Sequence, residues 1–223
     1  MIENLNIRQA NLSDIKFIIE AIIESEKSGS DIISSCNIFG LSEDQFSDIL
    51  KDVLSQNVED YDYYLSGFIV AEKNGEYVGA LGSFYEGTET PSGMIKATIL
   101  FQYLDKSKMK EISKNSRIIK GITPKREPGS LQLEHGYVIE KYRRQGVFLT
   151  LLKENIKRNL EKYSFPKVQG IIFKDNFKSY NAHLKFGYEV VDERRVDDPE
   201  ILNFFPYNTK ILVEFDGNKI TKL

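Results

Sequence analysis

The segment from Leu131 to Leu160 constrains the fold more than any other part of the chain. Leu131 to Ile139 is an apolar run typical of a buried strand, and Glu140 to Gly146 is a short polar and basic turn. An amphipathic helix is predicted over residues 147–162, because its apolar residues recur every three or four positions. A strand that passes through so short a turn into a helix favours an α/β protein, in which helices cover a sheet.

The rest of the chain supplies more helices and strands. Apolar periodicity predicts helices over residues 15–29 and 42–54, the second with a capping box of Ser42 and Gln45. Asn74-Gly75 between two alternating runs predicts a β-hairpin, since both residues accept positive φ. Further strands are expected at 5–10, 168–173, 188–191 and 210–215, and a short helix at 176–186 that Gly187 ends. The predicted order is β-α-α-β-β-insertion-β-α-β-α-β-β, a mixed α/β (α+β) sheet.

Residues 87–130 interrupt this pattern between the third and fourth strands. They combine several Gly and Pro residues with an apolar run, Ile95 to Leu104, and a polar helix-like stretch at 105–115. Structureless loops of this length are rare, so we expect an insertion with structure of its own. The whole chain, residues 1–223, is expected to form one domain that carries this insertion.

Composition excludes several classes of protein. The formal charge is −3, from 30 Lys+Arg and 33 Asp+Glu, which argues against a general nucleic-acid binder. Cys36 is the only cysteine, and the chain has two histidines, so neither a disulfide framework nor a Cys/His metal centre is expected. No long apolar run or basic leader occurs. We therefore expect a cytoplasmic protein with no membrane partner.

The basic turn before the predicted helix is a candidate anion site. The first amides of a helix have no intrahelical partner, and the helix dipole favours negative charge there. Gly146 lets the backbone approach a phosphate closely, and Lys141, Arg143 and Arg144 supply positive charge. Residues 141–185 contain 11 Lys+Arg and 3 Asp+Glu, which suits a polyanionic ligand. The alternative is a solvated basic face on the helix.

Two motifs resemble the GNAT superfamily of acyl-CoA-dependent N-acetyltransferases. Residues 143–148, Arg-Arg-Gln-Gly-Val-Phe, resemble its (Arg/Gln)-x-x-Gly-x-(Gly/Ala) motif. Residues 176–188, from Asn176 to Tyr188, resemble its Asn-x-x-(Ala/Ser)…Lys-x-Gly-(Phe/Tyr) stretch. The resemblance covers about residues 5–86 and 131–215 and implies a GNAT-like acyl-CoA N-acyltransferase fold.

The sequence departs from the family at two positions. Phe148 stands where the motif has a second small residue, and His183 stands where many members carry a tyrosine that acts as general acid. Tyr180 lies three residues away. His183 is therefore a candidate proton donor, because an imidazole titrates near ~6.5; a buried helix residue bonded to the backbone is the alternative.

The resemblance implies acetyl-CoA as the acyl donor and no metal. The donor is expected in a cleft where the strand at 131–139 separates from that at 168–173, with the pantetheine arm pairing like an added strand. The residues implied for cofactor binding are Tyr137, Val138, Ile139, Arg143, Arg144, Gln145, Gly146, Val147, Phe148 and Asn176. Asn176 has an alternative role as a helix cap.

The expected acceptor is a primary amine of a small molecule, such as an amino sugar, an amino acid or a polyamine-like compound. An alkylammonium has a pKa near ~10.4, so a base must remove a proton before attack. Glu134 is the candidate base, directly or through water, and His135 is its competitor; the two point to opposite faces of the strand unless a bulge intervenes. A chain of waters remains a third alternative.

Two other functions stay open. Phe148 and the missing tyrosine favour a catalytically silent acyl-CoA-binding sensor or scaffold. The acidic remainder of the surface suits basic peptides, which leaves a protein or peptide N-acetyltransferase as the third reading. A homodimer is left open as the assembly.

Overall fold

The computed structural model describes residues 5–162 and 167–222. Within them, seven strands form one sheet in the order β1-β2-β3-β4-β5-β7-β6. The strands are β1 (Asn6–Gln9), β2 (Ile69–Lys73), β3 (Glu76–Tyr85), β4 (Leu131–Val138), β5 (Lys167–Phe173), β6 (Glu189–Arg195) and β7 (Thr209–Asp216). Only β4 and β5 pair in parallel. The predicted mixed sheet is confirmed.

Three helices precede the hairpin, where two were predicted. They are α1 (Ile15–Lys27), α2 (Ser34–Phe39) and α3 (Glu43–Gln56). Helix α2 has six residues, too few to show a helical period in the sequence, and it ends at Gly40 in the left-handed conformation. The capping box of α3 is confirmed, with the Ser42 hydroxyl accepting from the Gln45 amide at 3.1 Å.

The predicted hairpin joins β2 to β3. Asn74 and Gly75 have φ of 52° and 80°, the left-handed values that a type I′ turn requires. At the other end of the chain, β6 spans seven residues rather than the expected four. The extra residues pair with β7 along the edge of the sheet.

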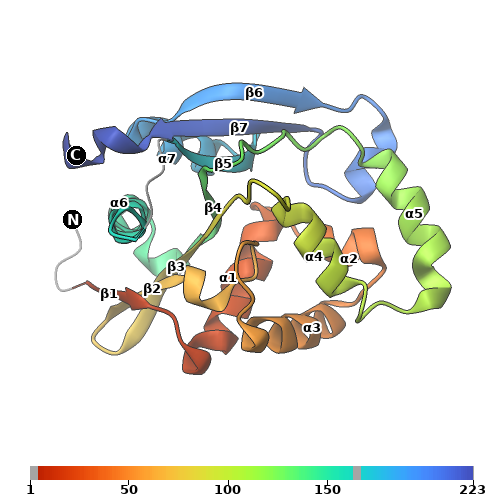
Figure 1. The fold of residues 1–223 in the computed structure, drawn as a ribbon, viewed down its shortest axis with the longest axis horizontal. Helices are drawn as coiled ribbons and strands as arrows, with labels where there is room; N and C mark the ends of the chain where they lie inside the picture. Colours follow the sequence, from red (N-terminus) through yellow and green to blue (C-terminus); the bar gives the residue numbers. More distant parts are fainter. Residues whose placement is uncertain (1–4, 163–166, 223) are drawn as a thin grey trace.

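The insertion between β3 and β4 contains structure of its own, as predicted. It holds α4 (Ser92–Leu100) and α5 (Met109–Ile118). The Glu86 carboxylate fixes the start of α4, accepting from the Ser92 amide at 3.0 Å and from its hydroxyl at 2.6 Å. Helix α5 packs against α2, so the insertion adds to the helical layer of the N-terminal half (Figure 1).

The two faces of the sheet carry different helices. Helix α6 (Val147–Leu160) packs on β2, β3 and β4, whereas α1 packs on β3 and β4 from the other side. Helix α7 (Phe177–Phe186) packs against β5 and ends at Gly187, whose φ of 111° confirms the predicted C-cap. Both faces of β4 are therefore covered, and Figure 1 shows this strand between the two halves of the molecule.

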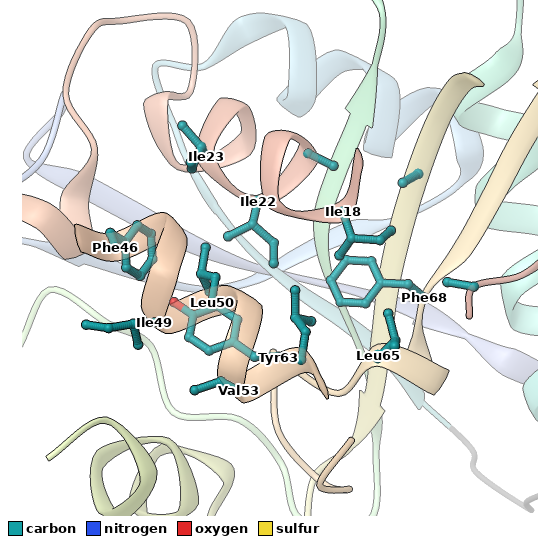
Figure 2. Close-up of a cluster of buried hydrophobic side chains, with 14 of the residues drawn as sticks. Ile18, Ile22, Ile23, Phe46, Ile49, Leu50, Val53, Tyr63, Leu65 and Phe68 are labelled. Carbon is teal, nitrogen blue, oxygen red and sulfur yellow. The ribbon is translucent and has the colours of Figure 1, made fainter. Parts of the chain in front are cut away.

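The core is divided by the sheet. On the α1 side, the isoleucines of α1 meet the apolar face of α3 and the rings of Tyr63 and Phe68 (Figure 2). On the α6 side, Leu151, Leu152 and Ile156 pack on the strands. The apolar faces predicted for the helices at 15–29 and 42–54 both pack into the core on the α1 side. A third cluster joins the insertion to the end of β5.

Candidate active site

Strands β4 and β5 are neighbours only at one end. Their register contains two pairs, Leu131 with Val168 and Gln132 with Gln169. The paired end is held by buried amides, since the Gln132 side chain donates to that of Gln169 at 3.0 Å. Beyond it the strands separate, which confirms the expected divergence. The backbone edge of β4 that faces β5 is then free of ladder bonds within the described residues.

A β-bulge interrupts β4 at the point of divergence. Between the pairs Gly82–Glu134 and Ala80–Tyr137, β4 has one residue more than β3. His135 takes a left-handed φ of 53° in this bulge. The extra residue breaks the alternation of side chains, so Glu134 and His135 lie on the same side of the sheet, toward α1 and the insertion. The sequence predicted opposite faces for Glu134 and His135 unless a bulge intervened, and the structure contains that bulge.

Glu134 forms an ion pair with Arg126, the last basic residue of the insertion. Both side chains are largely buried, with exposed fractions of 16% and 21%. The Arg126 guanidinium also lies over the Phe84 ring, 5.3 Å from its centroid. The insertion therefore contributes directly to the environment of the candidate base. No motif marked Arg126, although it stands in a charged stretch between Pro124 and Pro128.

His135 is enclosed by groups from α1 and from the loop that precedes β2. Its Nδ1 lies 3.0 Å from the Ser25 hydroxyl of α1, and its Nε2 lies 3.6 Å from the Asp62 carboxylate. Its ring stacks between Tyr63 and Phe68, with centroid distances of 5.6 and 6.3 Å. The Ser25 hydroxyl therefore occupies Nδ1, whereas Nε2 is buried and has no hydrogen-bond partner within the described residues.

Asp62 connects His135 to the insertion. Its carboxylate binds Lys96 of α4 at 2.6 Å. Burial opposes ionisation of Asp62, but the charge of Lys96 and the nearby His135 outweigh it, so the pKa of Asp62 lies well below its usual range. The Lys96 ammonium also lies 4.3 Å from the centroid of the Tyr63 ring.

The turn before α6 has the backbone that the anion site requires. Arg144 and Gly146 have φ of 62° and 86°, and no side chain caps α6 within the described residues. The leading amides of α6 therefore remain available for an anion. Arg143 is directed elsewhere, donating from Nε to the Val138 carbonyl at 2.9 Å, and Gln145 donates to the Lys141 carbonyl at 2.9 Å.

The backbone expected to pair with pantetheine is partly engaged already. The Ile139 amide donates to the Val78 carbonyl of β3 at 2.9 Å, and the Val138 carbonyl accepts from Arg143. The Tyr137 hydroxyl donates to Glu20 at 3.3 Å, and burial together with Glu20 raises the pKa of Tyr137 to about 12. The Tyr137 side chain therefore belongs to the α1 interface.

Phe148 packs against the bulged part of β4, on the side of the sheet that α6 covers. A Cβ on Gly136 would come within 2.6 Å of the Phe148 ring, so the ring rests directly on the bulged backbone of β4. The ring also makes an edge contact with His183, at 5.5 Å between centroids. The side chain thus points toward the sheet, while Val147 beside it is buried.

The two candidates on α7 have local partners. The Asn176 side chain accepts from the Ser179 amide at 3.3 Å and so caps the helix. His183 is buried, and its Nδ1 donates to the Ser179 carbonyl at 2.8 Å. A carbonyl only accepts, so the neutral ring carries its proton on Nδ1 and leaves Nε2 as an acceptor. Burial lowers the pKa of His183 against the effect of this bond.

Three further features bear on function. Burial raises the pKa of the Cys36 thiol to about 11, which keeps it protonated at neutral pH. The described part of the chain brings together no group of three or more His, Cys, Asp or Glu suited to a metal ion. Among its helices, none has the length and apolarity needed to cross a membrane.

Solved structures resemble this chain along nearly its whole length. An N-acetyltransferase from Staphylococcus aureus Mu50 matches with a TM-score of 0.65 and 14% identity, over 94% of this chain and 100% of that one. A Salmonella typhimurium protein named as an acetyltransferase, with its cofactor acetyl-CoA, matches at 0.54 and 14%, over 96% and 94%. The spermidine/spermine N-acetyltransferase of Vibrio cholerae matches at 0.54 and 12%, over 98% of each chain. No protein-family model matches the sequence, and neither does any curated protein.

Proposed function

We propose that this chain, which has the GNAT acetyltransferase fold, transfers an acetyl group from acetyl-CoA to a primary amine of a small molecule by direct transfer. One observation supports this most strongly: β4 and β5 separate beside the uncapped N-terminus of α6. This pairs an open strand edge with an anion site. The cytoplasm is the compartment we propose, and a homodimer remains a prediction.

The chain's own residues fit the donor. When bound, acetyl-CoA supplies an acetyl group activated as a thioester. The amides of Gly146, Val147 and Phe148 would hold the diphosphate at the start of α6, where Arg144 adds positive charge. The β4 edge near Tyr137 and Val138 would align the arm as an added strand. The Phe148 ring would have to turn away from Gly136 to admit it.

Glu134 is the base that the arrangement favours. An ammonium must lose a proton before it attacks, and a carboxylate can take that proton directly or through water. The pairing of Glu134 with Arg126 fixes its side chain on the β4 bulge. His135 is the weaker candidate, since Ser25, Asp62 and two aromatic rings enclose it.

Return of a proton to the sulfur is less well supported. Donation by His183 stays a prediction, and its bond to the Ser179 carbonyl favours the packing role, because Nε2 then carries no proton in the neutral ring.

Release of free thiol from acetyl-CoA tests the proposal. The purified protein, offered a panel of primary amines, is expected to release thiol in step with N-acetylated product. Acetylation of added peptides, followed by mass shift, would instead support a protein N-acetyltransferase.

A second function has one observation in its favour. The Phe148 ring covers the β4 backbone at Gly136, as expected of a module that binds acyl-CoA without turning it over. Such a sensor would gain thermal stability from acetyl-CoA but release no thiol with any amine. That result would overturn the proposed enzyme.

A further inference from the structure

Lys210 of β7 has no ion-pair partner in the part of the chain that the structure describes. Its ammonium lies over the rings of Phe205 and Phe173, 4.1 and 4.9 Å from their centroids. Among the described residues, no carboxylate oxygen lies within ion-pair distance, 4.0 Å, of its Nζ. The side chain is partly buried. Burial lowers the pKa of Lys210 to about 8, although Glu134 and Glu26 act in the opposite direction.

Two other largely buried basic residues differ from Lys210, because each of them has an ion-pair partner. Lys96 is paired with Asp62, and Arg126 with Glu134. Arg126 nevertheless keeps one unused donor, because its Nε is buried and has no hydrogen-bond partner among the described residues. The two rings beneath the Lys210 ammonium belong to the apolar cluster that includes Ile122 of the insertion, close in sequence to Arg126. Within the described residues, two cationic side chains with unpartnered donors, from β7 and from the insertion, therefore lie on the insertion side of the sheet, as Glu134 does.

An incoming anion would satisfy both donors. Unpaired buried donors and charges cost free energy, and a ligand that carries the missing charge recovers it. The β4 bulge meanwhile presents Glu134, which attracts an ammonium. Opposite charges are thus offered side by side, and a ligand that carries both would match them.

We propose that the acceptor is an amine that also carries an anionic group, a carboxylate or a phosphate, bound by Lys210 and Arg126 while its amino group lies toward Glu134. This rests on the proposed function and narrows its substrate class. It disfavours a polyamine, because each additional ammonium of such a ligand would meet the charge of Lys210.

Matched acceptors test the proposal. The pairs are β-alanine against its amide, and glucosamine 6-phosphate against glucosamine, with spermidine as the purely cationic amine. At least one anionic member is expected to exceed its neutral partner by roughly 10- to 100-fold in kcat/KM, the span of a charge-assisted hydrogen bond. Which pair shows the larger ratio distinguishes a carboxylate from a phosphate.

Variants locate the effect. Lys210→Met keeps the length of the side chain among apolar rings, so folding is expected to survive. It should raise KM for the anionic acceptor by roughly 10- to 100-fold. The ratio of kcat/KM between the anionic acceptor and its neutral partner should fall accordingly. Lys210→Arg, which keeps the positive charge, should restore part of the preference for the anionic acceptor. Lys174→Met is the matched control, because Lys174 is an exposed lysine paired with Glu193; it should keep the ratio.

Two results would overturn the inference. One is turnover of spermidine or the neutral amines at least as fast as of their anionic partners. The other is an equal rise in KM for both members of a pair in Lys210→Met. If no amine released thiol, the proposed function would fail separately. Titration with inorganic phosphate, followed by the NMR signal of the Lys210 ammonium, would then test anion binding by itself. A shifted signal would support anion binding at Lys210, and an unchanged signal would count against it.

Discussion

The two sides of β4 are built in different ways. On the side proposed for the donor, the candidate anion site consists of main-chain amides at the start of α6, all within one continuous segment. On the side proposed for the acceptor, Glu134 and His135 meet side chains from α1, the loop before β2 and the insertion. The first site depends on backbone shape, and the second on ion pairs between distant segments. A single substitution should therefore affect them differently.

The largest effect is expected from Gly146→Val. A β-branched residue resists the φ of 86° at this position, so the leading amides of α6 would move. Acetyl-CoA affinity should fall by roughly 100-fold or more, as for the loss of two charge-assisted hydrogen bonds. Isothermal titration calorimetry measures it.

Gly75→Val provides the control for that variant. Gly75 has a similar φ of 80° but lies in the β2–β3 hairpin, so it brings the same kind of strain away from α6. It should lower the melting temperature and leave acetyl-CoA affinity unchanged. Equal affinities for Gly146→Val and the wild type would remove the argument for a backbone anion site.

Glu134→Gln should have the next largest effect. Removing the base should lower kcat by roughly 100-fold, and most at low pH, where the amine is hardest to deprotonate. The pH profile of kcat is the measurement. Glu127→Gln serves as control, because Glu127 pairs with Lys167 outside the bulge. A wild-type profile in Glu134→Gln would shift the role of base to His135 or to water.

Asp62→Asn tests whether the acceptor side is held together by charge. Breaking a largely buried pair with Lys96 should lower the free energy of unfolding at pH 7 by about 3 kcal/mol. The pKa of Asp62 is depressed in the folded state, so its contribution is present above about pH 4 and is lost as the pH falls further. The difference from wild type should therefore shrink in acid.

Urea denaturation at several pH values makes that comparison. Asp197→Asn, at an exposed carboxylate paired with Arg195, should leave stability unchanged. If Asp62→Asn were equally silent, the buried ion pair would be no part of what stabilises the acceptor side.

The smallest effect is expected from His183→Phe. With the ring held by the Ser179 carbonyl, kcat should stay close to that of the wild type. Burial depresses the pKa of His183, so the wild type should lose stability as the pH falls below about 6.5. The variant should lack that step in thermal unfolding, and a large loss of kcat would instead identify a proton donor.

The same contrast explains what could be predicted from sequence. The hairpin at Asn74-Gly75, the start of α3 and the Gly187 cap follow from short-range rules, so they were foreseen. The uncapped start of α6 lies within the contiguous stretch Arg143 to Phe148 that marked it, and anion binding there stays a prediction. Arg126, Asp62 and Lys96 lie far apart in the chain, and only the folded sheet and the insertion bring Arg126 to Glu134 and the Asp62–Lys96 pair to His135. Helix α2 was missed because six residues show too little periodicity.

The β4 bulge has a consequence for how such a sequence can change. One additional residue separates the upstream half of the strand from the half near Tyr137, so the two halves are out of phase. Loss of a single codon here would restore strict alternation along β4. Every side chain after the deletion, up to the turn before α6, would then move to the opposite face of the sheet. Insertions and deletions should therefore be purged from these few positions during evolution, even where individual side chains are free to vary.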